Sequence, residues 1–116
     1  MDRLETLRAR TNDMVADLRR VVEAESFSQD LEGTAHCADV VWELGERLLG
    51  GKPERIEAAG RTHLLWRFGE EVRVLLLGHF DTVWPTGTLA RWPFTVTDDR
   101  ATGPGVFDMK AGIVQG

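Results

Sequence analysis

A short apolar run in the second half of the chain reads Val72-Arg73-Val74-Leu75-Leu76-Leu77-Gly78, and it leads into His79-Phe80-Asp81. A run of valine and leucine bounded by glycine is typical of a strand buried on both faces, as in parallel sheets flanked by helices. We therefore expect 72–77 to be a buried central strand of an α/β domain, with His79 just past its carboxyl end. Functional side chains of open α/β folds gather at that end of the strands.

His79 and Asp81 are two positions apart, so on an extended backbone both side chains project to the same side. Imidazole is a common zinc ligand, and a nearby carboxylate can hold its ring in place. A His-x-Asp sequence alone also fits a structural histidine with an ordinary hydrogen-bond partner. The pair is therefore a candidate metal site that needs a second signal.

The second signal is a glycine-rich segment, Gly103-Pro104-Gly105-Val106-Phe107-Asp108-Met109-Lys110-Ala111-Gly112. It places a carboxylate, Asp108, where the backbone can approach an ion closely, just before a predicted helix start. We expect His79 and Asp108 to lie close enough to share one ion, whose bonds would be about 2.0 to 2.2 Å long.

Two segments, 78–89 and 103–112, resemble in order and separation the motifs of a family of di-zinc hydrolases. The family includes glutamate carboxypeptidase, aminoacylase, acetylornithine deacetylase and succinyl-diaminopimelate desuccinylase. Gly103-Pro104-Gly105, where the deacetylase branches more often have Gly-Arg-Gly, favours the glutamate carboxypeptidase branch. The resemblance implies the amino-terminal part of a zinc-exopeptidase-like, three-layer α/β catalytic domain, with helices packed on a mixed sheet. Ala111 departs from the pattern, because many relatives have glycine there.

The same resemblance implies a role for each matching residue. His79 is implied as a ligand of one zinc ion, Asp108 as the carboxylate that bridges two zinc ions, and Asp81 as the catalytic aspartate that orients the site. Cobalt or manganese are expected substitutes for zinc. The peptide bond between Asp108 and Met109 is expected to be cis. The general-base glutamate and the remaining ligands are expected after Gly116, which makes the chain an expected amino-terminal fragment, inactive by itself.

The implied reaction is hydrolysis of an amide bond that releases a C-terminal amino acid such as glutamate. Two alternatives stay open: an N-acyl amino acid deacylase or desuccinylase of the same family, and a non-catalytic α/β binding module. The implied substrates are small peptides or N-acyl amino acids, and a full-length homodimer is compatible with the family. The acidic pair Glu70-Glu71 precedes the apolar run and is expected to form a solvated turn.

Composition sets wider limits on the protein. A chain of 116 residues with 28% charged and 42% hydrophobic residues is typical of a soluble globular protein, and we expect residues 1–116 to form part of one domain. The net charge of −5, with scattered Lys and Arg, argues against a nucleic-acid partner. We also expect no membrane association and a cytoplasmic location, because there is no long apolar run or signal peptide and Cys37 is the single cysteine.

Periodicity predicts the remaining elements. Apolar residues recur at helical spacing over Leu4–Ala24 and Leu31–Leu49, and alternation predicts a hairpin of Glu54–Ala59 with Arg61–Phe68. A second hairpin is expected around Asp98-Asp99. Five further side chains each have a structural and a functional interpretation, and the structural one is favoured for all of them. Cys37 is a buried hydrophobe or a reactive thiol, and His36 and His63 are surface residues or ligands. Trp84 and Trp92 serve packing or contact substrate.

Overall fold

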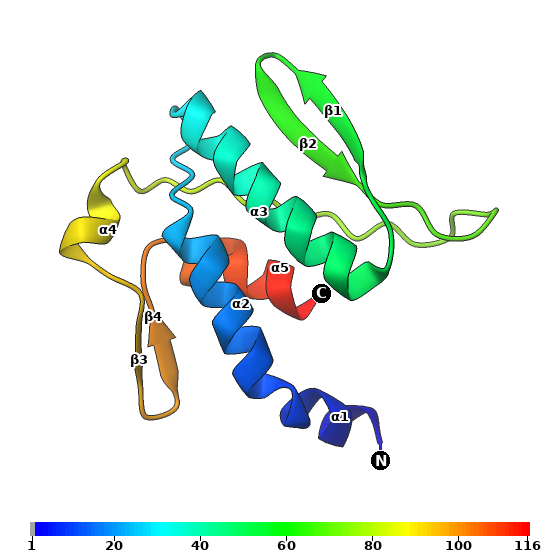
Figure 1. The fold of residues 1–116 in the computed structure, drawn as a ribbon, viewed down its shortest axis with the longest axis horizontal. Helices are drawn as coiled ribbons and strands as arrows, with labels where there is room; N and C mark the ends of the chain where they lie inside the picture. The colour runs from blue at the N-terminus through cyan, green and yellow to red at the C-terminus, as the bar shows by residue number, and fades with distance from the viewer. Residues whose placement is uncertain (1) are drawn as a thin grey trace.

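The computed structural model describes residues 2–116, and it contains helices and two small antiparallel sheets (Figure 1). The helical elements are α1 (Arg3–Ala9), α2 (Thr11–Glu23), α3 (Leu31–Leu49), α4 (Thr88–Arg91), the irregular turn η1 (Val106–Lys110) and α5 (Ala111–Gln115). The strands are β1 (Glu54–Ala58) paired with β2 (Arg61–Leu65), and β3 (Thr95–Thr97) paired with β4 (Arg100–Thr102). The α/β class expected from the sequence is confirmed.

The first predicted helix is divided into α1 and α2 at Arg10, whose φ and ψ of −98° and 4° are not helical. The Arg10 N–H turns back to the Leu7 carbonyl, and the Thr11 hydroxyl donates to the Arg8 carbonyl. Helix α1 buries no residue, so tertiary packing does not hold it in line with α2. Prediction of one continuous helix was therefore wrong at this point.

Helix α3 begins and ends where the sequence predicts. The Asp30 side chain accepts a hydrogen bond from the Gly33 N–H at the amino end, and Gly50 ends the helix in a left-handed conformation with a φ of 76°. The apolar faces of α2 and α3 meet in a core that includes Val21, Cys37, Val41 and Leu44. Cys37 is fully buried, which confirms its interpretation as a small core residue.

The β1–β2 hairpin covers one side of α3. Its turn uses Ala59 and Gly60, both with positive φ, as expected for a tight turn that matches the strand twist. Both strands end earlier than predicted, and Trp66 follows β2 to rest on Gly45 of α3. A Cβ atom at Gly45 would lie 2.2 Å from the Trp66 ring, so only glycine allows this close approach.

The apolar run is the main correction to the sequence analysis. The 72–77 segment forms no strand, and its Val and Leu side chains are 65 to 85% exposed. Prediction of a buried central strand was therefore wrong for this structure. The physical reason is that a central strand needs hydrogen-bonded neighbours and apolar layers on both faces, and no segment within residues 2–116 supplies them.

The expected mixed sheet is likewise not formed by residues 2–116, whose two sheets are both antiparallel hairpins. One parallel contact exists, an isolated bridge between Phe27 and Thr82. The shortest dimension of the molecule is 19 Å, which is roughly two helix diameters. No helix in residues 2–116 is long and apolar enough to cross a membrane.

Candidate metal centre

His79, Asp81 and Asp108 meet at one point of the structure. The His79 Nε2 atom lies 3.0 Å from Asp108 Oδ1. On the other side of the ring, Nδ1 lies 3.0 Å from the Asp81 carbonyl oxygen and 3.2 Å from Asp81 Oδ1. The imidazole is thus held between the two aspartates that the sequence analysis singles out, one on each nitrogen.

Two distant segments deliver these side chains. His79 follows the extended run, and its backbone N–H donates to Met109 Sδ at 3.4 Å. Asp108 lies in η1, where its φ and ψ of −122° and 94° depart from helical values. The peptide bond from Asp108 to Met109 is cis, as expected. The site is therefore built where the end of the extended segment meets the turn before α5.

Gly105 lets this turn approach the neighbouring chain. Its φ is 81°, and a Cβ atom there would lie 2.5 Å from the Thr82 Cγ2 atom. A side chain at position 105 would therefore force apart the two segments that carry Asp81 and Asp108. The glycine-rich sequence serves close backbone packing here.

Lys110 fixes the other end of the turn. Its side chain is 1% exposed, and Nζ donates to the carbonyl oxygens of Val21 at 2.9 Å and Ala24 at 3.1 Å. These carbonyls lie at the carboxyl end of α2, where a cation is favoured by the helix dipole. Burial lowers the pKa of Lys110, and the neighbouring Cys37 opposes that shift. Sequence analysis assigned no role to Lys110, because its partners are more than eighty residues away.

Ser28, which the sequence analysis did not single out, also reaches the site. The Ser28 hydroxyl lies 2.5 Å from Asp81 Oδ2, and its backbone N–H donates to the Thr82 carbonyl at 2.9 Å. The parallel bridge between Phe27 and Thr82 brings these segments together. Ser28 and Asp81 are separated by 53 residues, so no local pattern identifies the contact.

The protonation of His79 follows from its surroundings. Burial lowers its pKa, but hydrogen bonds to the Asp81 carbonyl and the Asp108 carboxylate, with the charges of both aspartates, raise the pKa above its ordinary value. Each ring nitrogen faces an oxygen that accepts hydrogen bonds, so both nitrogens carry hydrogen when the ring is protonated. The proton on Nε2 lies between this nitrogen and Asp108 Oδ1, which is the position that a metal ion bound by both atoms would take.

The donor set fits a metal ion in part. One imidazole nitrogen and one carboxylate oxygen are 3.0 Å apart, close to the roughly 3.4 Å separation of two ligands on a tetrahedral zinc ion with bonds of about 2.1 Å. The Asp108 side chain is 76% exposed, which leaves its second oxygen open to another ion. Within residues 2–116, no cluster of three or more His, Cys, Asp or Glu side chains is suited to hold a metal. Two ions would therefore need further ligands.

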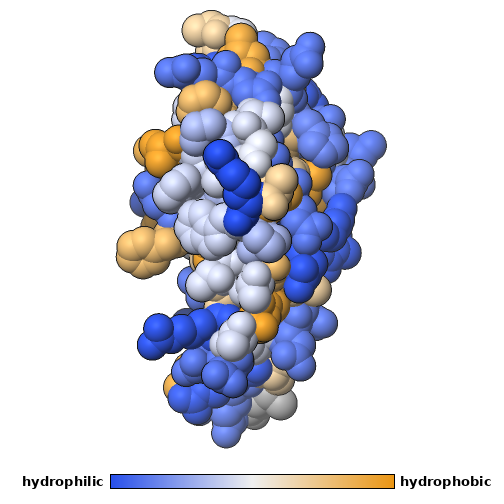
Figure 2. Space-filling model, turned by 90° about the vertical axis from the view of Figure 1, so that its left-hand side faces the viewer, coloured by the Kyte–Doolittle hydropathy of each residue, from blue (hydrophilic) through white to orange (hydrophobic). Residues whose placement is uncertain are grey.

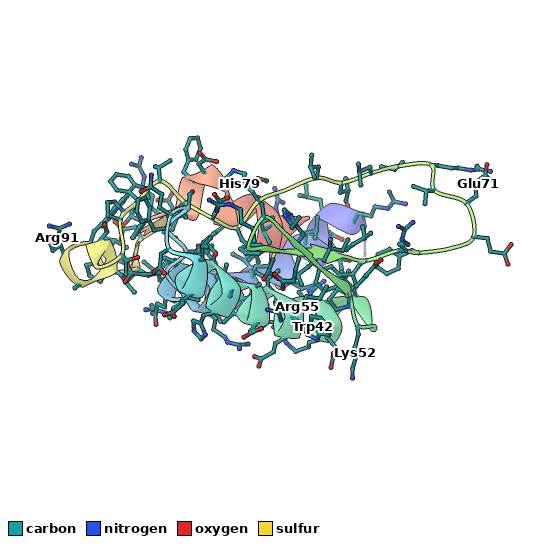
Figure 3. All side chains as sticks on the ribbon, turned by 90° about the horizontal axis from the view of Figure 1, so that it is seen from above. Trp42, Lys52, Arg55, Glu71, His79 and Arg91 are labelled. Carbon is teal, nitrogen blue, oxygen red and sulfur yellow. The ribbon has the colours of Figure 1, made fainter. Side chains whose placement is uncertain are left out.

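The other candidate residues lie away from this centre. His36 and His63 are exposed on α3 and β2, as predicted. Glu71 lies at the tip of a long loop that extends away from the helices (Figure 3). Its position agrees with a solvated turn, and it is far from His79 in the same view.

Trp84 and Trp92 pack against each other in an edge-to-face arrangement, with ring centroids 5.0 Å apart. Their loop is held by Glu25, whose carboxylate accepts a hydrogen bond from the Gly87 N–H at 2.9 Å. Packing is therefore one role of both rings, and each stays partly exposed, at 42% and 37%. Seen from the side of α4, the surface is mainly hydrophilic with scattered hydrophobic residues (Figure 2).

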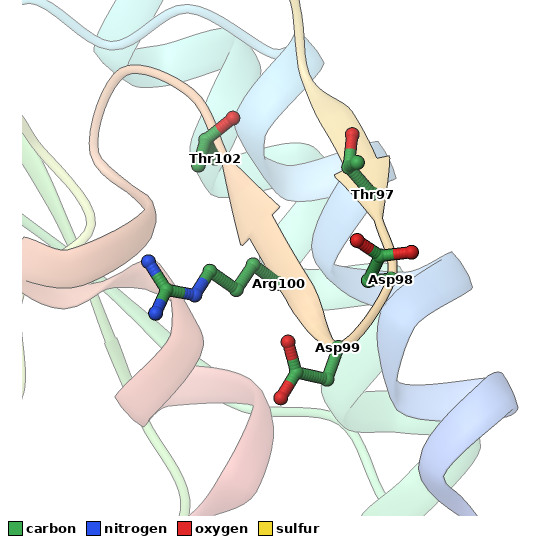
Figure 4. Close-up of a pocket in the computed structure, with 5 residues that line it drawn as sticks. All are labelled: Thr97, Asp98, Asp99, Arg100 and Thr102. Carbon is green, nitrogen blue, oxygen red and sulfur yellow. The ribbon is translucent and has the colours of Figure 1, made fainter.

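A separate hollow lies at the tip of the β3–β4 hairpin (Figure 4). It is lined by Thr97, Asp98, Asp99, Arg100 and Thr102. None of the residues of the metal centre lines it. Two adjacent carboxylates beside an arginine are what a solvated hairpin turn presents, so this hollow does not contribute to the candidate site.

The close approach of His79 to Asp108 can now be set beside the comparison with known families. Residues 75–116, which include the whole candidate centre, match the model of peptidase family M20/M25/M40. This match and the relative described next support the same peptidase family for the chain. It is similar to Carboxypeptidase G2 of Pseudomonas sp. (strain RS-16), with 33% identity over 106 residues. The match covers 85% of this chain and 25% of that relative, so the chain spans about a quarter of the relative's length.

Proposed function

We propose that the protein is a zinc-dependent hydrolase that cleaves an amide bond and releases a C-terminal amino acid such as glutamate. The observation that carries the proposal is the 3.0 Å approach of His79 Nε2 to Asp108 Oδ1, with the opposite ring nitrogen held by Asp81. A solvent-exposed imidazole and carboxylate in this relation would supply two of the ligands that a divalent cation needs. The similarity to a carboxypeptidase supports the choice of reaction.

His79 and Asp108 would hold the metal in different ways. An imidazole offers one nitrogen to one ion, so His79 would be a terminal ligand through Nε2. A carboxylate has two oxygens, so Asp108 can bridge two ions. Metal ions at such a site polarise the scissile carbonyl and lower the pKa of a bound water. Cobalt or manganese would be able to replace zinc.

Asp81 would act on the metal-binding residue His79 and not on the substrate. Its carbonyl and its carboxylate both lie against His79 Nδ1. This arrangement keeps hydrogen on Nδ1 and leaves the Nε2 lone pair free for metal. The role is that of an orienting aspartate. No residue within 2–116 is assigned as the general base, because His79, Asp81 and Asp108 each have another proposed role.

The substrate class is proposed as small peptides with a C-terminal acidic residue. The Gly103-Pro104-Gly105 sequence and the similarity to Carboxypeptidase G2 favour this class over N-acyl amino acids. A deacylase or desuccinylase of the same family is the second candidate. The two are distinguished by comparing hydrolysis of a peptide that ends in glutamate with hydrolysis of N-acetyl and N-succinyl amino acids.

The test uses the full-length protein with and without zinc. His79→Ala and Asp108→Ala are each expected to lower metal-dependent amide hydrolysis by at least about 100-fold, because each removes a metal ligand. His63→Ala is the matched control, since His63 is an exposed histidine outside the centre. Full activity in either ligand variant would refute the proposal, and zinc binding without hydrolysis of any of these amides would favour a binding module.

A further inference from the structure

We propose that Ser28 is a positioning residue of the metal centre, which acts through Asp81 to fix the orientation of the His79 ring. The inference rests on the proposed metal site and adds a residue from a distant part of the chain. A continuous series of contacts runs from the Ser28 hydroxyl to Asp81 Oδ2 at 2.5 Å, from Asp81 Oδ1 to His79 Nδ1 at 3.2 Å, and from His79 Nε2 to Asp108 at 3.0 Å.

The Ser28 hydroxyl is directed to the carboxylate and not to the backbone. It also lies 2.9 Å from the Thr82 carbonyl, but it has one hydrogen to donate. That carbonyl already accepts the Ser28 backbone N–H at 2.9 Å. The charged Asp81 oxygen is both the closer acceptor and the stronger one. The hydroxyl hydrogen therefore belongs to Asp81.

The backbone around Ser28 is held firmly enough to position a neighbour. Its N–H is bonded to Thr82, and its carbonyl accepts from Arg61 Nη1 at 2.6 Å. On the same segment, the Thr82 N–H donates to the Ser26 carbonyl at 2.8 Å. The Ser28 backbone is thus held at both its N–H and its carbonyl, and its hydroxyl has a defined direction toward Asp81.

Asp81 needs such support because its side chain is 39% exposed. Water competes for an exposed carboxylate, and a carboxylate free to rotate presents Oδ1 to His79 only part of the time. The hydrogen bond to Oδ2 selects the rotamer in which Oδ1 faces Nδ1. Partners behind a metal-binding histidine determine which ring nitrogen is free for the ion.

Ser26 supplies a matched control on the same segment. Its hydroxyl donates to the Phe80 carbonyl at 2.6 Å, and it is 1% exposed. Ser26→Ala removes a hydroxyl that joins the same two segments but does not touch Asp81. A purely structural role of the serines would make Ser26→Ala and Ser28→Ala equivalent, or the more buried Ser26 more sensitive.

The first measurement is zinc affinity of the full-length protein by competition with a chelator. We expect Ser28→Ala to weaken zinc binding roughly tenfold, the lower end of the 10- to 100-fold effect of removing a residue behind a metal ligand. Ser28→Thr keeps the hydroxyl and is expected to restore affinity. Ser26→Ala is expected to stay within about twofold of the wild type. Equal losses in the two alanine variants, or no rescue by a folded Ser28→Thr, would overturn the inference.

The second measurement does not require metal. In the metal-free full-length protein at fixed pH, the His79 Nδ1 proton should give a resonance protected from exchange with water, and Ser28→Ala should broaden it while Ser26→Ala preserves it. An unchanged resonance in Ser28→Ala overturns the inference. If Ser28→Ala does not fold, Ser28→Cys, with a weak S–H donor, is expected to show the same broadening. If the wild type neither binds zinc nor hydrolyses these amides, the proposed function alone is overturned. The Nδ1 resonance would still report whether Ser28 orients the His79 ring.

Discussion

Replacement of Lys110 by methionine tests how the turn that carries Asp108 is held. Methionine keeps much of the length of the side chain and removes the ammonium group. Two carbonyl oxygens at the end of α2, those of Val21 and Ala24, then lose their donor. The Lys110 side chain is 1% exposed, so water cannot replace the donor without opening the structure.

The size of the effect follows from these contacts. A hydrogen bond from a charged donor contributes about 1.5 to 3 kcal/mol, and Lys110 makes two. The cost of burying the ammonium group offsets part of this sum, as the lowered pKa of Lys110 indicates. We expect Lys110→Met to lower the free energy of unfolding by about 2 to 4 kcal/mol.

The assay is urea unfolding of the full-length protein, followed by tryptophan fluorescence. Lys52→Met is the matched control, because Lys52 is exposed just after α3 (Figure 3). A surface change of this kind should stay within about 0.5 kcal/mol. The reasoning is refuted if Lys110→Met is as stable as Lys52→Met, because the buried ammonium would then contribute nothing net.

Three further outcomes are expected. A hydrogen bond from the Gly33 N–H, with one from Thr86, lowers the pKa of Asp30. The Asp30 carboxylate therefore stabilises the fold above about pH 4, and this contribution is lost as the pH falls through its folded-state pKa. Asp30→Asn should therefore lose less stability than the wild type between pH 7 and pH 3, measured by urea unfolding. Gly105→Ala should abolish tight zinc binding in the chelator assay, because of its φ of 81° and the 2.5 Å approach to Thr82, and wild-type affinity would contradict this. A polypeptide of residues 1–116 alone should bind zinc weakly and should self-associate through the exposed 72–77 run. Leu76→Lys should reduce this association, measured by light scattering. A monodisperse wild-type polypeptide would disprove the expected self-association.

Local sequence signals were sufficient where the structure is determined by neighbours along the chain. Helix α3 has a side-chain cap at Asp30 and a left-handed glycine at its end, and both act within a few residues. The β1–β2 turn depends on the conformational freedom of Gly60. Spacing also placed His79 and Asp81 on one side of an extended segment. These features could be predicted because their energies depend on short sequence separations.

Other features depended on the tertiary structure. Val72–Leu77 has the composition of a buried strand, but burial requires partner strands and covering layers, and residues 2–116 do not provide them. The hydrogen bonds of Ser28 and Lys110 around the candidate centre join residues 53 to 89 positions apart. A serine in a turn or a lysine before a helix has no distinctive sequence pattern that would predict them. The approach of His79 to Asp108 could therefore be predicted from residue type and motif. The contacts that hold them in place could not, because they exist only when distant segments pack together.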